Sequence, residues 1–555
     1  MNTLFNLLTI VYFVWIVRNI LFWVSLWQIK EYRLDRLIVF LKETIQGRYL
    51  FTSIGSILKW LAIALYFLTI HRVYLASLLE YFVFLIYLFH SIKVLQELFG
   101  RALKRPVVTL KSFVLVILSF SVIVLLLFVP LSDKFLWLLF IDKITFAIVA
   151  FFIFFFSFPS ELYRDFRIKR AVLKLQAHKK LLVIGVTGSY GKSSTKEFIA
   201  QILKKKFKIL YTQKTDNTPI GIANTIHKGL DKNIEIFIVE MGAYKKGEIS
   251  QICDIVRPKI GVLTGINNQH LSLFGNLINT MDTKYELIDS LPKNGLGFFN
   301  ANNEYVRKLL HRVTPESKKM KVFYRTEDSS SLFQKDSSSI VAYNVSHGKT
   351  FVVFDVQIYS VERGYKKRIT NLRANVIGRH NIENILPGIF IADYLGLPSS
   401  EIRDAVFSLV GLSSKMTITR DVRGIICIDD THNSNPEGIL AILKYVKHYK
   451  SDSYYKTQKK IFVLQPMIEL GKNASEDHYR IAQEIGRVCD MLFLTNENYY
   501  NSIVRGVEDS GGKCIVAVGD PSEIIEFIDK NLEKEDIVVF EGRESSNAFK
   551  KLVRK

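Results

Sequence analysis

The segment of this sequence best suited to chemistry is a glycine-rich turn that joins a predicted strand to a predicted helix. Residues 181–186 are apolar and rich in branched side chains, which is typical of a buried parallel strand. The turn and the start of the helix comprise Thr187, Gly188, Ser189, Tyr190, Gly191, Lys192, Ser193 and Ser194. Such a turn predicts a phosphate-binding loop, because glycines let backbone N–H groups surround an anion at the positive end of a helix.

Lys192 and Ser193 extend the chemistry expected of this loop. A lysine at this place reaches the outer phosphates of a nucleotide, and the hydroxyl next to it can hold Mg²⁺. The spacing Gly-x-x-Gly-Lys-Ser departs from the common one, since Val186 stands where a first glycine would be. The alternative is an ordinary glycine turn between a strand and a helix.

Strand-like and helical segments alternate after the loop. Strands are expected at residues 181–186, 208–212, 234–239, 259–264 and 295–300, with helices between them. This alternation predicts an α/β fold with a mostly parallel sheet, whose nucleotide site lies at the carboxyl ends of the strands. Glu240 stands at one such end and can complete a Mg²⁺ shell, the alternative being a plain strand-end carboxylate.

Five apolar runs dominate the first third of the chain. They cover about residues 4–27, 51–70, 73–92, 113–131 and 135–158, and each approaches the ~20 residues needed to cross a bilayer. Lys and Arg cluster after the first, third and fifth runs, so the positive-inside rule places the N-terminus outside and everything after the fifth run in the cytoplasm. Much of the net charge of +22 lies in these flanks, and no basic–aromatic motif points to nucleic acid.

Several ionisable residues fall within the apolar runs, namely Arg18, Lys59, Glu80, Asp142 and Lys143. Charged groups are costly in lipid and often mark a function. Pairing between helices, or a position nearer the interface, is the favoured interpretation. The alternative is that they line a groove for a lipid-borne head group.

Eight blocks of sequence resemble, in order, those of the Mur ligases. The first five are TGSYGKSS at 187–194, VEMGA at 239–243, NNQHLSLFG at 267–275, TKYEL at 283–287 and NANN at 300–303. The others are GRHNIEN at 378–384, DDTHNSNP at 429–436, and VLQPMIELG at 463–471 with His478. The last block is similar to that of the D-alanyl-D-alanine-adding type, MurF.

The resemblance implies three regions. Residues 1–165 form the added transmembrane helical region, residues 175–410 a middle ATP-binding α/β domain with the phosphate loop, and residues 411–555 a small Rossmann-like C-terminal domain. The implied protein is a multi-pass protein of the cytoplasmic membrane with its catalytic domains in the cytoplasm. It acts as an ATP-dependent amide ligase of peptidoglycan precursor assembly, activating a peptide-borne carboxylate and joining it to an amine such as D-Ala-D-Ala.

The resemblance also implies residue roles. The catalytic residues are Lys192, His270 and Lys284. ATP contacts come from the loop 187–194, Asn381, Lys415 and Asp430. Mg²⁺ ligands, for one or two ions, are Ser193, Glu240, His270 and Lys284, with Lys284 either carbamylated or in direct contact with phosphate. His432, Asn433, Asn435 and Glu469 belong to the amine-substrate region.

The sequence departs from the family pattern mainly in the amine half and at the front. Lys415 stands where an arginine is usual, Gln465-Pro466 replaces Gly-Asp, and Glu541-Gly542-Arg543 replaces Lys-Gly-Ser. Apolar spans occupy the place of a UDP-binding domain, so the acceptor is either UDP-linked or lipid-linked. Two alternatives stay open: a ligase for another envelope polymer of the poly-γ-glutamate type, and a non-catalytic membrane scaffold that retains an ATP fold.

Overall fold

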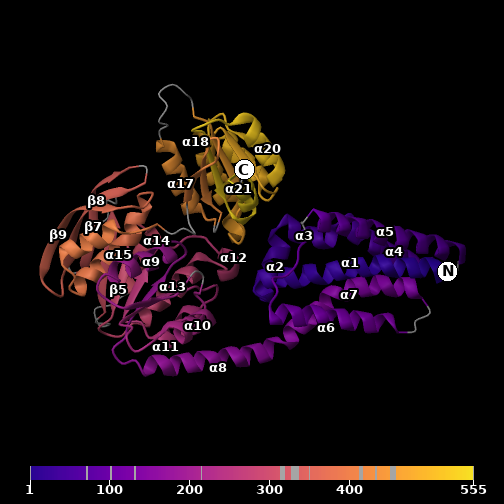
Figure 1. Ribbon diagram of the computed structural model, residues 1–555, viewed down its shortest axis with the longest axis horizontal. Helices are drawn as coiled ribbons and strands as arrows, with labels where there is room; N and C mark the ends of the chain where they lie inside the picture. Colours follow the sequence, from indigo (N-terminus) through magenta and orange to yellow (C-terminus); the bar gives the residue numbers. More distant parts are fainter. Residues whose placement is uncertain are drawn as a thin grey trace. The chain divides into compact units, whose positions relative to one another are not determined.

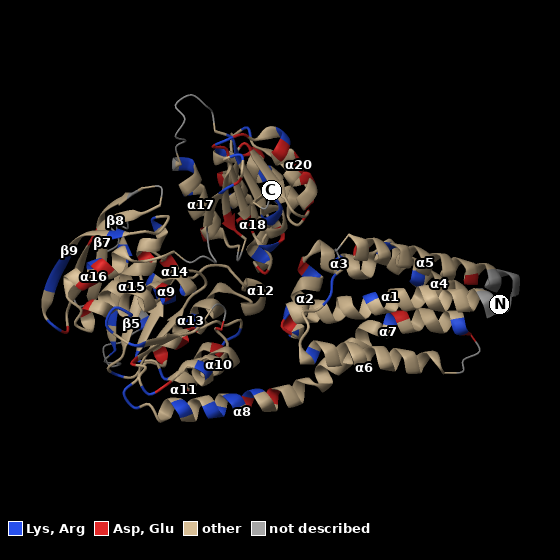
Figure 2. Ribbon diagram, viewed as in Figure 1, with Lys and Arg blue, Asp and Glu red and all other residues tan. Residues whose placement is uncertain are grey.

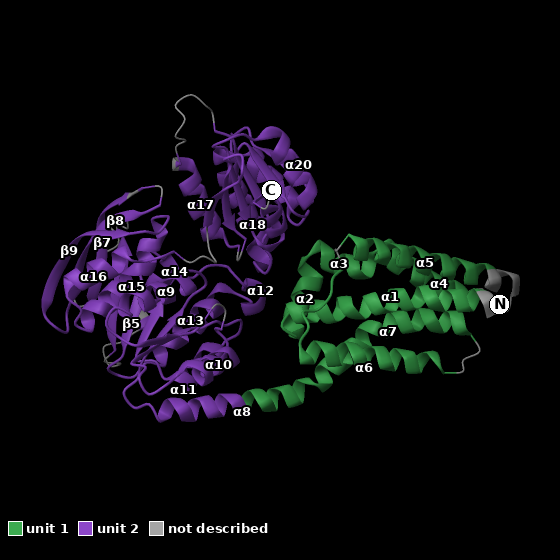
Figure 3. Cartoon of the chain, viewed as in Figure 1, with its two compact units in different colours: residues 1–165 green, residues 166–555 purple. Residues whose placement is uncertain are grey.

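The protein is described from a computed structural model. The described residues are 2–69, 73–100, 103–129, 133–213, 216–312, 319–326, 337–348, 350–411, 417–431, 434–449 and 458–553. The chain forms two compact units, Met1–Asp165 and Phe166–Lys555, which Figure 3 colours separately.

The first unit is helical (Figure 1). It contains α1 (Asn2–Ile29), α2 (Leu34–Glu43), α3 (Ile45–Thr52), α4 (Ile54–Thr69), α5 (Val73–Phe99), α6 (Leu110–Leu127) and α7 (Lys134–Phe155). Among the described residues, five helical stretches are long and apolar enough to cross a membrane: Leu4–Ile29, Ile45–Leu68, Leu78–Phe99, Leu110–Leu127 and Lys134–Gln176. The number of spans expected from the sequence agrees, and the last stretch continues beyond the expected end.

Charged residues are sparse along the helices of this unit (Figure 2), and several of them form ion pairs. Lys59 Nζ lies 2.7 Å from Asp142 Oδ2, and the Trp15 indole donates to Asp142 Oδ1 at 2.7 Å. Arg18 donates two hydrogen bonds to Glu97, at 3.0 and 3.1 Å. The favoured pairing of Arg18, Lys59 and Asp142 is therefore confirmed.

The remaining two ionisable residues of the apolar runs behave differently. Lys143 Nζ donates to the Ser56 hydroxyl at 2.9 Å and to the Ser56 carbonyl at 3.1 Å. Within the described part of the chain, Glu80 makes no ion pair and is partly exposed.

Helix α8 (Ser157–Gln176) leads into the second unit, and Figure 2 shows Lys and Arg along it. Its C-terminal half packs on α10 (Pro219–Gly229) and neighbouring helices through Ala171, which is fully buried. Arg167 Nη2 donates to Asn224 Oδ1 at 3.0 Å, and Lys174 Nζ donates to the Ile226 carbonyl at 3.1 Å. The ATP-binding region therefore begins with a docked helix.

The N-terminal part of the second unit contains a nine-stranded sheet, in the order β2-β3-β1-β4-β5-β6-β7-β8-β9. Its strands are β1 (Leu182–Thr187), β2 (Ile209–Tyr211), β3 (Ile236–Glu240), β4 (Ile260–Leu263), β5 (Leu296–Asn300), β6 (Met320–Thr326), β7 (Ser338–His347), β8 (Val352–Ser360) and β9 (Tyr365–Ala374). The strands pair in parallel from β2 to β7, as the alternation predicts, and antiparallel from β7 to β9. The antiparallel extension was not expected.

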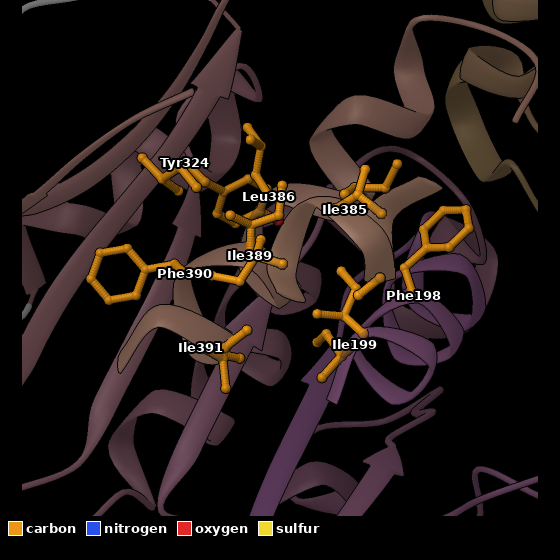
Figure 4. Close-up of a cluster of buried hydrophobic side chains, with 14 of the residues drawn as sticks. Phe198, Ile199, Tyr324, Ile385, Leu386, Ile389, Phe390 and Ile391 are labelled. Carbon is orange, nitrogen blue, oxygen red and sulfur yellow. The ribbon is translucent and has the colours of Figure 1, made fainter. Parts of the chain in front are cut away.

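Two helices pack together over one face of this sheet. Helix α9 (Lys192–Leu203) begins at the phosphate loop, and α15 (His380–Tyr394) lies against it. Figure 4 shows Phe198 and Ile199 of α9 in one buried cluster with Ile385 and Ile389 of α15. Further helices are α11 (Glu248–Val256), α12 (Leu271–Phe274), α13 (Leu277–Asp289), α14 (Glu304–Leu309) and α16 (Ser399–Phe407).

The C-terminal part has its own six-stranded sheet, in the order β10-β11-β15-β12-β13-β14. Its strands are β10 (Thr417–Arg420), β11 (Ile426–Asp430), β12 (Lys460–Leu464), β13 (Met491–Leu494), β14 (Ile515–Val518) and β15 (Ile537–Glu541). Its helices are α17 (Pro436–His448), α18 (Ala474–Val488), α19 (Tyr500–Glu508), α20 (Pro521–Asn531) and α21 (Ser546–Val553). All strands except β10 are parallel to their neighbours, which fits the expected Rossmann-like domain.

Candidate active site

The phosphate loop follows β1 and is shaped by two glycines. A Cβ atom at Gly188 would lie 2.1 Å from Thr264 Oγ1, so only glycine allows this approach to the end of β4. Gly191 has a φ of 79°, in the left-handed region that glycine adopts without strain, and it caps α9. The loop is closed by Ser189, whose N–H donates to the Gly265 carbonyl at 2.6 Å. The expected strand–turn–helix is thus present.

Lys192 is the first residue of α9 and folds back over the loop. Its Nζ donates to the carbonyls of Gly188 and Ser189, both at 2.8 Å. The ammonium group therefore stands beside the turn whose N–H groups would receive a phosphate. This placement fits the role expected of Lys192 toward the outer phosphates of ATP.

Glu240 ends β3 beside the end of β1, with Val186 as its register partner. It is 3 % exposed, accepts a hydrogen bond from Asn217 Nδ2 at 3.2 Å and lies 3.4 Å from Lys196 Nζ through Oε2. Oε2 has no hydrogen-bond partner among the described residues. A strand-end carboxylate with spare acceptor capacity, next to a phosphate loop, fits the donor set that Mg²⁺ prefers.

Lys284 of α13 is buried beside the phosphate-loop lysine. Its Nζ donates to the Ala243 carbonyl at 3.3 Å, and the side chain is 3 % exposed. Burial, followed by the charge of Lys192, lowers the pKa of Lys284 to about 7, against the opposing effects of Glu248 and Glu286. A lysine of this kind is largely neutral just above pH 7 and can react as a nucleophile.

His270 joins Lys192 and Lys284 in the same electrostatic neighbourhood. Burial lowers the pKa of His270, the two lysines act in the same direction, and Glu469 opposes them. The three residues expected to be catalytic therefore lie close together. This grouping of cations and a neutral imidazole suits a polyanionic substrate such as ATP with its metal.

Three residues of the segment 267–270 contact acidic side chains of the C-terminal part. His270 Nδ1 lies 2.6 Å from Glu469 Oε2, and Asn268 Nδ2 donates to Asp477 Oδ2 at 3.2 Å. Asn267 donates to the Glu437 carboxylate. Glu469 was expected in the amine-substrate region, and its carboxylate contacts the imidazole of His270.

The other expected ligand residues are spread over both parts of the unit. Asn381 begins α15 and donates to the Ile377 carbonyl at 2.8 Å, while Asp430 ends β11. Asn435 caps α17 by accepting the Gly438 N–H at 3.0 Å, so its side chain has a structural task. Lys415, His432 and Asn433 lie outside the described residues.

Several side chains around the loop were not singled out from the sequence. Lys196 is fully buried against Glu240, and the Thr264 hydroxyl donates to the Tyr190 carbonyl. Glu383 accepts from Asn300 and Asn302 at 3.0 and 2.8 Å. The NANN and GRHNIEN blocks, which contain these residues, were the available signals for this last cluster.

Two of the departures from the family pattern meet in space. The Gln465 N–H donates to the Glu541 carbonyl at 2.9 Å, and the Glu544 N–H donates to Gln465 Oε1 at 3.0 Å. Glu541 is fully buried next to Asp430, and its carboxylate has no hydrogen-bond partner among the described residues. These departures from the family pattern thus lie together at the carboxyl ends of β12 and β15, two neighbouring central strands.

Comparison with known proteins identifies both parts of the second unit. The Mur ligase middle domain matches residues 186–392, and the Mur ligase, glutamate ligase domain matches residues 416–543. Together the two matches cover more than half of the chain.

Individual relatives agree with this assignment. A UDP-N-acetylmuramoyl-tripeptide–D-alanyl-D-alanine ligase of Borreliella burgdorferi is 27 % identical over 360 residues, covering 65 % of this chain and 71 % of the relative. The enzyme of that name from Haemophilus influenzae is 24 % identical, covering 70 % and 80 %.

Solved structures share the fold. MurF from Acinetobacter baumannii superposes with a TM-score of 0.59 at 19 % identity, over 71 % of this chain and 81 % of that one. MurF from Thermotoga maritima in complex with ADP gives 0.57 at 22 % identity, over 70 % and 83 %. The chain belongs to the Mur ligase family of ATP-dependent amide ligases and is of the MurF type.

Proposed function

We propose that this protein is a membrane-anchored, MurF-type ligase that completes a peptide of a peptidoglycan precursor by adding D-Ala-D-Ala or a similar amine. The observation that carries the proposal is the convergence of the phosphate loop with Lys192, His270 and Lys284 inside a Mur ligase fold. A buried lysine with a lowered pKa is not expected in a scaffold without activity. The ligase interpretation is therefore preferred.

The proposed reaction has two steps. An oxygen of the substrate carboxylate attacks the γ-phosphorus of ATP, and the bond to the β-phosphate oxygen breaks, giving an acyl phosphate and ADP. The amine nitrogen then attacks the acyl carbon, loses a proton, and phosphate leaves as the amide forms. Lys192 stabilises negative charge on the transferred phosphoryl group, so the chain contributes positioning and electrostatics.

Ser193, Glu240, His270 and Lys284 are proposed to hold Mg²⁺, as one or two ions. The metal supplies neutralisation of phosphate charge when bound. We further propose that Lys284 is carbamylated. A neutral Lys284 amine adds to CO₂ and releases a proton, which replaces a cation that repels Mg²⁺ with an anionic oxygen ligand. The pKa of about 7 at Lys284 supports this, because it leaves neutral amine available near physiological pH.

The first unit is proposed to place the enzyme at the cytoplasmic membrane, with five spans and the catalytic unit in the cytoplasm. Its five apolar stretches precede the Mur ligase matches, which begin at residue 186. These helices occupy the place of the UDP-binding domain that is usual in the family. The acceptor carboxylate is therefore proposed to be lipid-linked or delivered at the membrane surface. Reporter fusions at the C-terminus test the orientation, and an extracellular C-terminus would contradict it.

The test of the ligase proposal is phosphate release from ATP by the full chain, with panels of peptide carboxylates and amines. We expect release that requires both substrates and falls by at least about 100-fold in Lys192→Ala. The matched control is Lys205→Ala, an exposed lysine of the same region. Release that needs neither a carboxylate nor Lys192 would reject the proposal.

A further inference from the structure

We propose that Glu469 is a positioning residue for His270, and that through it the metal-binding edge of the ATP site depends on the C-terminal part of the chain. The inference deepens the proposed function and rests on His270 serving as a metal ligand there. It concerns a contact between two residues that lie 199 positions apart in the sequence.

The geometry of the pair assigns each imidazole nitrogen a task. His270 Nδ1 lies 2.6 Å from Glu469 Oε2, and a carboxylate can only accept, so the ring hydrogen is on Nδ1. Nε2 is then the nitrogen with a lone pair for a cation. A carboxylate behind a metal-binding imidazole fixes ring orientation and raises ligand strength, and its loss commonly costs 10- to 100-fold in metal affinity.

Both partners of this contact hold unusual backbone conformations. His270 has a φ of 61° and Glu469 a φ of 68°, and neither is glycine. A non-glycine residue in the left-handed region is strained, so such residues persist where surrounding contacts hold them there. Two of them facing each other indicate that both loops are built for this contact.

The backbone around the pair holds the two loops together as well. The Ser272 N–H points to the Glu469 carbonyl at 3.4 Å, and a Cβ added at Gly471 would lie 3.2 Å from the Ser272 nitrogen. The Glu469 side chain is 6 % exposed and that of His270 27 %. The carboxylate is thus enclosed, whereas the imidazole keeps an open side, as a residue that receives a ligand requires.

The neighbouring contacts of the same segment provide an internal comparison. Asn268 meets Asp477 at 3.2 Å, and Asn267 meets Glu437, in both cases as an amide donating to a carboxylate. Neither amide is proposed to bind metal. A contact that only joins the two parts of the unit would act alike at Asp477 and at Glu469, whereas the proposed role belongs to Glu469 alone.

The experiment is a titration of Mn²⁺ onto the full chain with saturating AMP-PNP, followed by electron paramagnetic resonance. We expect the weaker Mn²⁺ site to lose at least about 10-fold in affinity in Glu469→Ala, and less in Glu469→Gln, which still accepts from Nδ1. The control Asp477→Asn, of the same kind of contact, should stay within about 2-fold. His270→Ala combined with Glu469→Ala should bind no more weakly than His270→Ala alone.

Unchanged Mn²⁺ affinity in Glu469→Ala would overturn the inference, as would an equal loss in Asp477→Asn or an additive loss in the double variant. Circular dichroism of each variant checks folding, and Glu469→Gln keeps the side-chain shape if the alanine variant unfolds. Phosphate release that depends on Lys192 measures the proposed function separately. That function can therefore stand while the role of Glu469 fails.

Discussion

Lys59 of the first unit and Lys284 of the second are both buried, but the protein accommodates their charges in opposite ways. In the first unit, Lys59 lies 2.7 Å from Asp142, and the Trp15 indole donates a hydrogen bond to the other oxygen of the same carboxylate. In the second, Lys284 is equally buried, but its hydrogen bond in the described part of the chain goes to the Ala243 carbonyl. The charge of Lys59 is balanced by a carboxylate of the protein. Lys284 instead has a pKa lowered to about 7, which reduces the fraction of the side chain that is charged.

The difference separates structural charges from charges kept for a ligand. Burying an unpaired ion costs several kcal/mol, so a fold either supplies the counter-charge or shifts the protonation state. The helical unit supplies it and gains specific helix contacts. The catalytic unit groups Lys192 with His270 and Lys284, and the lowered pKa values of His270 and Lys284 limit the positive charge that is buried there.

The largest effect is expected at Lys284. Lys284→Ala should lower ligation by at least about 100-fold, because under the proposed carbamylation it removes an anionic metal ligand. Since CO₂ reacts with the neutral amine, the carbamate should decline as the pH falls below about 7, where the amine is protonated. Carbon-13 spectra in labelled bicarbonate measure the carbamate, and short carboxylic acids should partly restore the alanine variant.

The matched control for this prediction is Lys246→Ala, whose side chain is 70 % exposed. It should keep wild-type activity with and without bicarbonate. If no carbamate signal appears at pH 8 and CO₂-depleted buffer leaves the rate unchanged, Lys284 acts in its unmodified form. Lys284 would then differ from Lys59 in that it contacts phosphate directly.

A smaller but still large effect is expected at the paired lysine. Lys59→Met leaves Asp142 buried without its counter-ion, which should cost about 3 kcal/mol or more in the free energy of unfolding of the first unit. All five tryptophans lie in this unit and all four cysteines lie in the second. Tryptophan fluorescence therefore follows one unit and a thiol-reactive dye follows the other.

The dye-detected transition should stay unchanged in Lys59→Met, which serves as the internal control. Adding Asp142→Asn should restore much of the lost stability, because no lone charge remains. If Lys59→Met alone unfolds like the wild type, the ion pair is not structural. The buried charges of the first unit would then favour the other interpretation, a groove that binds a lipid head group.

The sequence predicts best what local pattern controls. The runs at 181–186 and 234–239 correspond closely to β1 and β3, and Glu240 ends β3, because β-branched runs and glycine turns are read over a few residues. The Lys59–Asp142 pair could be anticipated in kind, since lone charges in lipid are costly. The phosphate loop and its helix were likewise predictable.

Features that depend on distant contacts could not be predicted. A lysine in a predicted amphipathic helix, such as Lys196, is expected to be exposed. In the structure Lys196 is buried, because Glu240 at the end of β3 lies opposite its ammonium group. The contact of His270 with Glu469 joins loops of two domains. Strands β7 to β9 extend the sheet in antiparallel fashion, and single-sequence patterns do not reveal which edge they join.

The smallest effect concerns a third kind of buried charge, at Glu541. Burial, followed by the charge of Asp430, raises the pKa of this carboxyl well above its usual value. The folded chain then binds a proton that the unfolded chain has released, so this group contributes less stability as the pH rises above about 4.5. Glu541→Gln removes the titrating group and should stabilise the second unit at pH 8, with a smaller gain or none at pH 4.

Chemical unfolding followed by far-ultraviolet circular dichroism measures this change at both pH values, because a thiol-reactive dye needs the thiolate and does not react at pH 4. Glu544→Gln is the matched control. The Glu544 carboxylate accepts from Thr495 at 2.7 Å and from Asn496 at 2.8 Å, so its replacement should bring no gain. A loss of stability in Glu541→Gln at pH 8 would mean that the ionised carboxylate is satisfied, as Asp142 is. Glu541 would then resemble the paired charges of the first unit. The difference between the two units would be limited to Lys192, His270 and Lys284.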